Sequence, residues 1–222
     1  MSIIENLFNN LKNAFTNFFA SIEKPLEVLV NYGLLITLFF LILFLVISII
    51  KHKSSIKNIK NTKALVVCAM LLALNLIIKL FNVEIGNYLR LGFGFITLPI
   101  AAMLYGPFIG GLLGIVQDIT YYIFHQTGPY LPLMGIGAII SGLIHGNILY
   151  NKKITWLKAA AAVILDLFIV NMTINTIAVY SIVDRAIYAL FASRVLSSLL
   201  QVPIQTIIIY FILNRVKKIN KL

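Results

Sequence analysis

The residues with the clearest capacity for chemistry lie inside long apolar segments. Near the C-terminus, five polar side chains share one helical face: Arg194, Ser197, Ser198, Gln201 and Gln205. Hydrogen bonds to neighbouring helices would explain the two serines well. An arginine is more costly in hydrocarbon than packing requires, so Arg194 is a candidate for contact with a ligand or for gating, and Gln201 is a further candidate.

A second polar and aromatic face precedes it in the chain, and its members are Gln117, Asp118, Tyr121, Tyr122 and His125. Carboxylate, phenol and imidazole groups on one face could stack against a flat heterocycle and hydrogen-bond to it. The alternative is structural, with Asp118 paired to Arg194 or to a backbone donor. Both interpretations stay open at this point.

Four further polar residues lie in apolar segments. Asn171 and Asn175 are one helical turn apart, and we include Asn175 among the candidate ligand contacts. Asp166 is better explained as a contact between helices. Lys79 lies near the end of its segment, where we expect a long side chain to extend to solvent.

Catalytic and metal-binding functions find no support in these residues. Ser141 and His145 are one turn apart on one helix, which is not the usual arrangement of a nucleophile and its base. No Cys/His cluster has the spacing of metal ligands, and no Gly-x-x-x-x-Gly-Lys-Ser/Thr motif for ATP is present. We predict a protein that is not an enzyme, with no metal and no cofactor; any ATP hydrolysis would occur on partner chains.

The composition indicates that these groups are positioned by helices in a lipid bilayer. The chain is 60% hydrophobic and only 11% charged, which a soluble domain could not tolerate. Apolar runs are long and continuous rather than alternating, so we predict an all-α integral membrane protein. The net charge of +11 fits basic loops beside a membrane, and no basic patch interleaved with aromatics suggests nucleic-acid binding.

The apolar runs, and the polar, glycine and proline residues between them, predict seven membrane spans. Residues 1–25 form an amphipathic pattern of an interfacial helix rather than a signal peptide. The expected spans are 28–50, 63–83, 91–104, 108–124, 131–150, 156–182 and 186–213. This gives three parts: the amphipathic helix at 1–25, an extra span with a basic loop at 26–61, and a six-helix domain at 62–222.

The distribution of lysine and arginine supports this count and predicts an orientation. With alternating spans, twelve basic residues fall on the side of the 51–63 loop and four on the other side. The positive-inside rule then puts the N-terminus outside and the C-terminus in the cytoplasm.

Small residues predict close contacts between helices. Ala69 and Ala73 are spaced for one face, Gly106-Pro107 begins a run of glycines at 110, 111 and 114, and further small residues lie at 135, 137, 141 and 142. Internal packing would account for most of them. A smooth alanine face could also dock a partner helix.

From about Thr62 to Leu213 the sequence resembles the S components of energy-coupling factor (ECF) transporters, and within them the folate family. The segments that carry the resemblance are 88–93, 95–99, 103–111, 117–118, 130–132, 141–146 and 175–176, together with Arg194 and Pro203. The run Gly-Pro-x-x-Gly-Gly with Asp118 after it is the most specific of these.

The resemblance implies a six-helix bacterial cell-membrane protein that binds one water-soluble vitamin near the extracellular face. The site would lie under the loops at 82–90 and 125–131, which adds Arg90 to the candidate contacts. Ala69 and Ala73 would dock a transmembrane coupling subunit, and two ATPase subunits would complete the transporter. Transport would involve toppling of the S component in the bilayer.

Two departures bear on the ligand. The folate family usually has tryptophan after the Asn-Thr pair, where this chain has Ile177, and lysine three residues after the position of Arg194, where it has Ser197. Folate or a related pterin is the expected ligand. There are two alternatives: the chain binds a different water-soluble vitamin or precursor, or it is a transporter that acts alone.

Overall fold

The structure is a computed structural model, and it describes residues 30–80, 83–85, 89–91, 93–124, 129–181 and 187–219. The amphipathic pattern predicted for residues 1–25 lies outside these ranges. Six helices of the described part are long and apolar enough to cross a membrane. The chain is therefore a multi-pass membrane protein of the predicted helical class.

The helices and strands follow one another along the chain with short connections. They are α2 (Gly33–His52), the 3₁₀ helix η1 (Lys53–Lys60), α3 (Thr62–Leu80), β1 (Val83–Ile85), β2 (Leu89–Leu91), the 3₁₀ turn η2 (Phe93–Phe95), α4 (Thr97–Tyr105), α5 (Pro107–Phe124), α6 (Pro132–Leu149), α7 (Trp156–Asp166), the π-helix η3 (Leu167–Ile174), α8 (Asn175–Tyr180) and α9 (Ile187–Ile219). Because α7, η3 and α8 are continuous, they form one span.

The expected span at 91–104 is wrong. The chain there pairs β1 with β2 as an antiparallel hairpin, turns through η2, and forms only the nine-residue helix α4. Nine residues rise about 14 Å, which is roughly half of a hydrocarbon core. Residues 97–103 of α4 are all buried by neighbouring helices. Their continuous hydrophobicity therefore reflects burial in protein rather than contact with lipid.

Glycines allow α5 and α6 to pack backbone against backbone, as the small residues predict. A Cβ atom on Gly142 would lie 2.2 Å from the carbonyl oxygen of Gly110, and one on Gly114 would lie 2.2 Å from the carbonyl oxygen of Ala138. Gly106 has a φ of +98° and turns the chain between α4 and α5. This close packing fixes α6 at the centre of the molecule, where most of its residues are buried.

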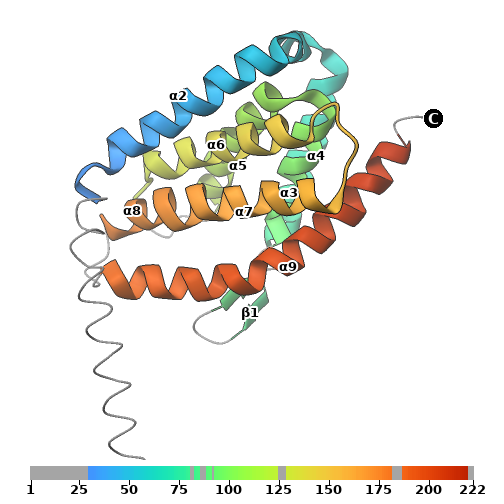
Figure 1. The fold of residues 1–222 in the computed structure, drawn as a ribbon. Coiled ribbons are helices and arrows are strands. Elements are labelled where there is room, and N and C mark those ends of the chain that lie inside the picture. The colour runs from blue at the N-terminus through green and yellow to red at the C-terminus, as the bar shows by residue number, and fades with distance from the viewer. Residues whose placement is uncertain are drawn as a thin grey trace, which may run out of the picture.

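The first span, α2, packs along α6 and η3 through a hydrophobic cluster that includes Phe44, Ile144 and Val170 (Figure 1). Within it, Asn147 Nδ2 donates to Ser48 Oγ over 2.9 Å. An amide in this environment needs such a partner. The predicted extra span is therefore part of the packed bundle, while the boundary at residues 61 and 62 stays a prediction.

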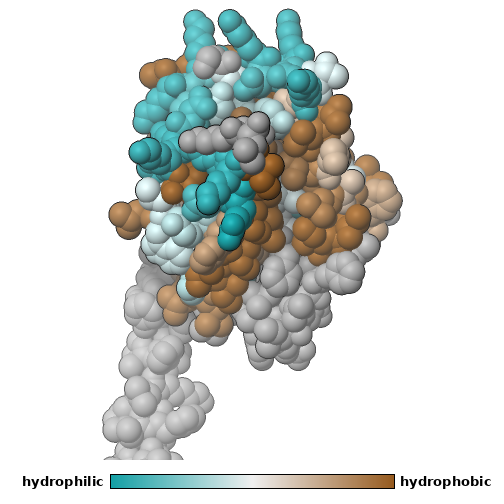
Figure 2. All heavy atoms as spheres, turned by 90° about the vertical axis from the view of Figure 1, so that its right-hand side faces the viewer, coloured by the Kyte–Doolittle hydropathy of each residue, from teal (hydrophilic) through white to brown (hydrophobic). Residues whose placement is uncertain are grey.

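Basic residues gather at one end of the bundle. The turn at η1, the end of α6 and the end of α9 all lie on the right of Figure 1, and Figure 2 looks onto this end and shows hydrophilic side chains gathered there. Contacts join the three segments, since Asn58 Nδ2 donates to the Tyr150 hydroxyl over 3.4 Å and Lys217 Nζ donates to the Lys152 carbonyl. Asn58 Nδ2 also donates to the Tyr105 carbonyl at the end of α4, over 2.8 Å. Although α4 is short, it still returns the chain to this end, so the alternation of sides is kept.

Candidate functional site

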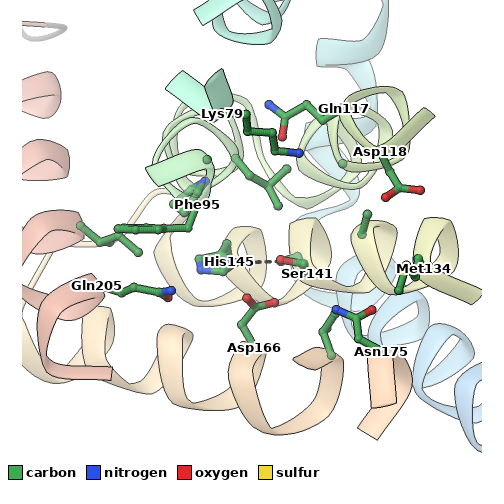
Figure 3. Close-up of a pocket in the computed structure, with 17 residues that line it drawn as sticks. Lys79, Phe95, Gln117, Asp118, Met134, Ser141, His145, Asp166, Asn175 and Gln205 are labelled. Atoms are coloured by element: carbon green, nitrogen blue, oxygen red, sulfur yellow. Dashed lines mark hydrogen bonds between the residues drawn. The ribbon is translucent and has the colours of Figure 1, made fainter. Parts of the chain in front are cut away.

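A cavity of about 330 Å³ lies between the helices. This volume is in the range of small-molecule sites. Its lining combines apolar side chains with an unusual number of polar ones, which come from α3, α5, α6, α7, α8 and α9 (Figure 3). The polar members are Lys79, Gln117, Asp118, Ser141, His145, Asp166, Asn175 and Gln205.

One end of the cavity carries a cation and a carboxylate. The Lys79 ammonium lies 4.2 Å from the centroid of the Tyr121 ring, and Tyr130 donates its hydroxyl to Asp118 Oδ2 over 3.1 Å. Burial, and then the neighbouring Asp118 carboxylate, raise the pKa of Tyr130 to about 12. Tyr130 therefore stays protonated and keeps donating to Asp118. The ring of Tyr122 packs against Tyr130 with centroids 5.1 Å apart.

A buried hydrogen-bond network fixes the wall beside this end. Thr97 Oγ1 accepts from Asn75 Nδ2 over 2.8 Å and from Gln117 Nε2 over 3.0 Å. Asn75 also donates to the carbonyl of Gly94 over 2.8 Å. The short helix α4 is thus tied to α3 and α5, and the amide group of Gln117 is held in one orientation.

The other end of the cavity is built around a buried carboxylate. Asp166 Oδ1 is buried and accepts no hydrogen bond from the described residues. Figure 3 shows the Asp166 carboxylate pointing toward His145 and Ser141 on α6, with Gln205 reaching in from α9. His145 Nδ1 lies 2.9 Å from the Ser141 carbonyl oxygen rather than its hydroxyl. The carboxylate as a whole interacts with Ser141 and His145. A buried oxygen such as Oδ1 that has no donor among the described residues is costly, so this end is suited to a ligand that donates hydrogen bonds.

The π-helix η3 lies between Asp166 and Asn175 in the same span. The backbone N–H of Asn175 donates to the Val170 carbonyl, five residues earlier. The side-chain hydroxyls of Thr173 and Thr176 also donate to carbonyls five residues earlier. Such segments are rare and occur frequently at functional sites. Here it separates two polar residues of one span that both line the cavity.

The structure brings together some of the residues that the sequence nominates. Gln117, Asp118 and Asn175 line the cavity, and Tyr121 contacts Lys79 at its edge. Arg194 and Gln201 do not belong to the lining: Arg194 donates to Asn171, and Gln201 accepts from Gln205 over 3.2 Å. The expected alternative of a pair between Asp118 and Arg194 is wrong.

The side chains of two nominated residues are outside the described part of the structure. His125 is outside the described residues, and only the backbone of Arg90, in β2, is described. Their assignment as ligand contacts stays a prediction.

Sequence reasoning missed Lys79, His145 and Asp166 as lining residues. Lys79 was expected to extend to solvent, but its side chain turns toward Tyr121 and the cavity. Asp166 was expected to join helices, and its carboxylate does interact with Ser141 and His145 of α6. It also lines the cavity, where its Oδ1 accepts no bond from the described residues. One sequence signal could have identified them. Placing an ionisable residue deep in an apolar segment costs free energy, so such residues are candidates for functional sites. Among the described residues no cluster of His, Cys, Asp and Glu could hold a metal.

The departure at Ile177 has a structural explanation. Ile177 is 5% exposed and packs against Gly33 of α2, where a Cβ atom would lie 2.5 Å from Ile177 Cγ2. It does not line the cavity. A tryptophan at this position could not coexist with α2 so close, so the isoleucine reflects packing of the extra span.

A separate apolar groove of about 200 Å³ runs between α3 and α5. Ala69 lies in its lining, and both Ala69 and Ala73 are exposed on α3. The small side chains leave the backbone of α3 accessible to another helix.

Comparison with known proteins gives consistent matches. The family model described as "ECF transporter, substrate-specific component" matches residues 63–213. A protein named "Folate transporter FolT" from Clostridium novyi (strain NT) is 29% identical over 171 residues, which cover 73% of this chain and 99% of that protein. Another of the same name from Leuconostoc mesenteroides is 31% identical over 161 residues, covering 69% of this chain and 86% of that protein.

The fold also matches a solved structure, entitled "Crystal structure of FolT bound with folic acid". The TM-score is 0.64 at 24% sequence identity, and the match covers 70% of this chain and 95% of the other. The predicted fold class is confirmed; the short β1–β2 hairpin is a feature that sequence analysis did not anticipate.

Proposed function

Because this chain belongs to the family of substrate-specific components of ECF transporters, we propose that it captures folate or a related pterin for an ATP-driven importer. Membership of this family makes the chain a transport subunit rather than an enzyme, as predicted. Two folate transporters that it resembles over most of their length support folate as the ligand.

The buried carboxylate of Asp166 is the observation that carries this proposal within the site. A pterin ring presents a ring N–H and an exocyclic amino group side by side, and a carboxylate can accept both hydrogens. Asp166 Oδ1 is buried at the cavity wall and accepts nothing from the described residues. Pairing with the pterin edge would repay the cost of burying this group. Gln205 and His145 lie beside it for the remaining polar atoms of the ring.

The opposite end suits the glutamate part of folate. Lys79 lies in the cavity lining near the last turn of α3, and its ammonium contacts the Tyr121 ring. The glutamate carboxylates would pair with Lys79, while Asp118 is occupied by Tyr130. We place the heterocycle inward at Asp166 and the glutamate toward Lys79. Arg90 and His125 are proposed as further contacts at that end, on the resemblance alone.

Ligand binding by the purified chain tests this function. Folic acid, 6-hydroxymethylpterin, riboflavin, thiamine and biotin would be titrated in detergent by calorimetry. Folic acid is expected to bind with the highest affinity. Tight binding of another vitamin in place of folic acid would support the alternative ligand. Absence of binding to any of them, by protein with native helicity and a cooperative thermal transition, would contradict the proposal.

The remaining elements of the proposal concern partners and orientation. A transmembrane coupling subunit would dock on α3 at Ala69 and Ala73, and two ATPase subunits would supply the energy. The basic end would face the cytoplasm of a bacterial cell, since positive loops are retained inside. The C-terminus then lies in the cytoplasm and the N-terminus outside. A transporter that acts alone would instead import vitamin in liposomes without these partners.

A further inference from the structure

A second pocket lies at the basic end, away from the vitamin cavity. Its volume is about 560 Å³, and it opens between the segment after α6 and the last turns of α9. The residues that line it are Lys153, Ile154, Tyr210, Phe211, Asn214, Arg215, Lys217 and Lys218. Four cationic side chains from two segments thus converge on one hollow, together with the amide of Asn214.

Among the described residues that line this pocket there is no Asp or Glu to neutralise the charge. The sequence has no Asp or Glu between positions 27 and 84, between 118 and 166, or after 184. Burial lowers the pKa of Lys152 beside the pocket, and the positive charges of Lys51 and Lys158 lower it further. Lys217 gives one hydrogen bond to the Lys152 carbonyl, which leaves other ammonium hydrogens available. The pocket therefore has a surplus of donors and positive charge that an anion would satisfy.

The other wall of the pocket is apolar and exposed. Phe211 of the lining is 61% exposed, and Trp156, which is outside the lining and contacts Tyr210, is 45% exposed. The ring of Trp156 packs against Tyr210 with centroids 5.6 Å apart, and Tyr210 in turn packs against Phe211 at 5.7 Å. Tryptophan and tyrosine are typical of the level where lipid headgroups meet acyl chains. The hollow thus offers cations to a headgroup and aromatic rings to the chain beneath it.

We propose that this pocket binds the phosphate headgroup of one anionic phospholipid, with its acyl chain along Tyr210 and Phe211. The shape and the aromatic wall favour a lipid over free phosphate, which would use only the cationic side. Basic pockets between transmembrane segments at the cytoplasmic side are known to hold such headgroups. The bound lipid would join the segment after α6 to the end of α9.

The test uses the purified full-length chain and native mass spectrometry with lipids of matched acyl chains. The probes are dioleoylphosphatidylglycerol, dioleoylphosphatidylcholine and glycerol 1-phosphate. One phosphatidylglycerol is expected to be retained in preference to phosphatidylcholine, and glycerol 1-phosphate is not expected to compete at the same concentration. The double substitution Arg215→Gln with Lys218→Gln is expected to weaken retention roughly 30-fold.

The matched control is Lys57→Gln with Lys60→Gln, which removes the same charge from the exposed surface of η1 at the same end. Its retention is expected to change by about twofold or less. Equal weakening in both double variants would show a diffuse attraction and overturn the proposal. Equal retention of phosphatidylcholine, or competition by glycerol 1-phosphate alone, would also overturn it. Phe211→Ala keeps every charge, and unchanged retention there would contradict the seating of the acyl chain.

Discussion

Arg194 Nη1 donates to Asn171 Oδ1 over 2.7 Å and to the Asn171 carbonyl oxygen over 3.3 Å. The pair joins α9 to the π-helix η3, and neither residue lines the cavity. The nomination of Arg194 as a ligand contact is therefore replaced by a structural role in our proposal. The bond holds α9 against the span that carries Asp166 and Asn175.

A double-mutant cycle tests this role. Arg194→Gln and Asn171→Ala are each expected to lower the free energy of unfolding by about 2 kcal/mol, because each removes one partner of a charged hydrogen bond. The double variant is expected to lose little more than either single one. The measurement is thermal and denaturant unfolding in detergent, with folic acid affinity measured in parallel. A large loss of folic acid affinity with unchanged stability would show that Arg194 contacts the ligand after all.

Asp166→Asn is expected to weaken binding of both folic acid and 6-hydroxymethylpterin by about 100-fold, since it removes the carboxylate that accepts from the pterin edge. Without ligand, the same variant is expected to melt at an equal or higher temperature, because asparagine carries no buried charge and Asp166 Oδ1 has no donor among the described residues. Calorimetry and melting curves measure the two effects. Loss of stability with normal affinity would identify Asp166 as a contact between helices.

Lys79→Gln is expected to weaken binding of the glutamate part of folic acid without affecting binding of the pterin part. Affinity for folic acid falls roughly thirtyfold, because the glutamate carboxylates lose their cation. Affinity for 6-hydroxymethylpterin, which lacks the glutamate, stays unchanged. Lys79→Arg serves as the conservative control and is expected to retain most folic acid binding. Equal weakening of both ligands by Lys79→Gln would reverse the proposed orientation.

Replacing Ala69 and Ala73 by leucine is expected to abolish copurification with a coupling subunit. The leucine at position 69 would fill the groove beside α3, and the one at position 73 would add bulk to the exposed surface of the same helix. Both would keep a partner helix away from the backbone. Folic acid binding by the isolated chain is expected to remain normal, because the groove is separate from the cavity. Leucine at the lipid-facing position Met70 is the control. A complex that survives the double substitution would place the docking surface elsewhere.

Asn147→Leu is expected to have opposite effects with and without α2. In the full chain, Ser48 Oγ keeps its bond to the Phe44 carbonyl but loses the donor that joins it to α6, so stability is expected to fall by about 1 kcal/mol. In a chain that starts at residue 62, Asn147 has lost Ser48 already, and leucine is expected to stabilise the helix surface in detergent. Melting temperatures of the four proteins measure this. A stabilising effect in the full chain would mean that the bond to α2 contributes nothing.

The fold class and most of the spans could be predicted from the amino-acid sequence, because long continuous apolar runs are stable only as helices in a membrane. It also located the close packing of α5 on α6, since glycine spacing such as that of 106, 110 and 114 is a local signal. It could not tell the span expected at 91–104 from a short buried helix. Burial in protein and burial in lipid select the same apolar residues, and only the contacts of α4 distinguish them.

The site depended on tertiary structure for a related reason. A polar residue in an apolar helix has the same local signal whether it meets a ligand or another side chain. Gln117, Asp118 and Asn175 were nominated and line the cavity, whereas Arg194 had an equally strong signal and bonds to Asn171. Asp166 had the weaker claim and lies at the cavity with Oδ1 unpaired among the described residues. The partner of each group is decided by how the helices pack, and a single sequence does not record that packing.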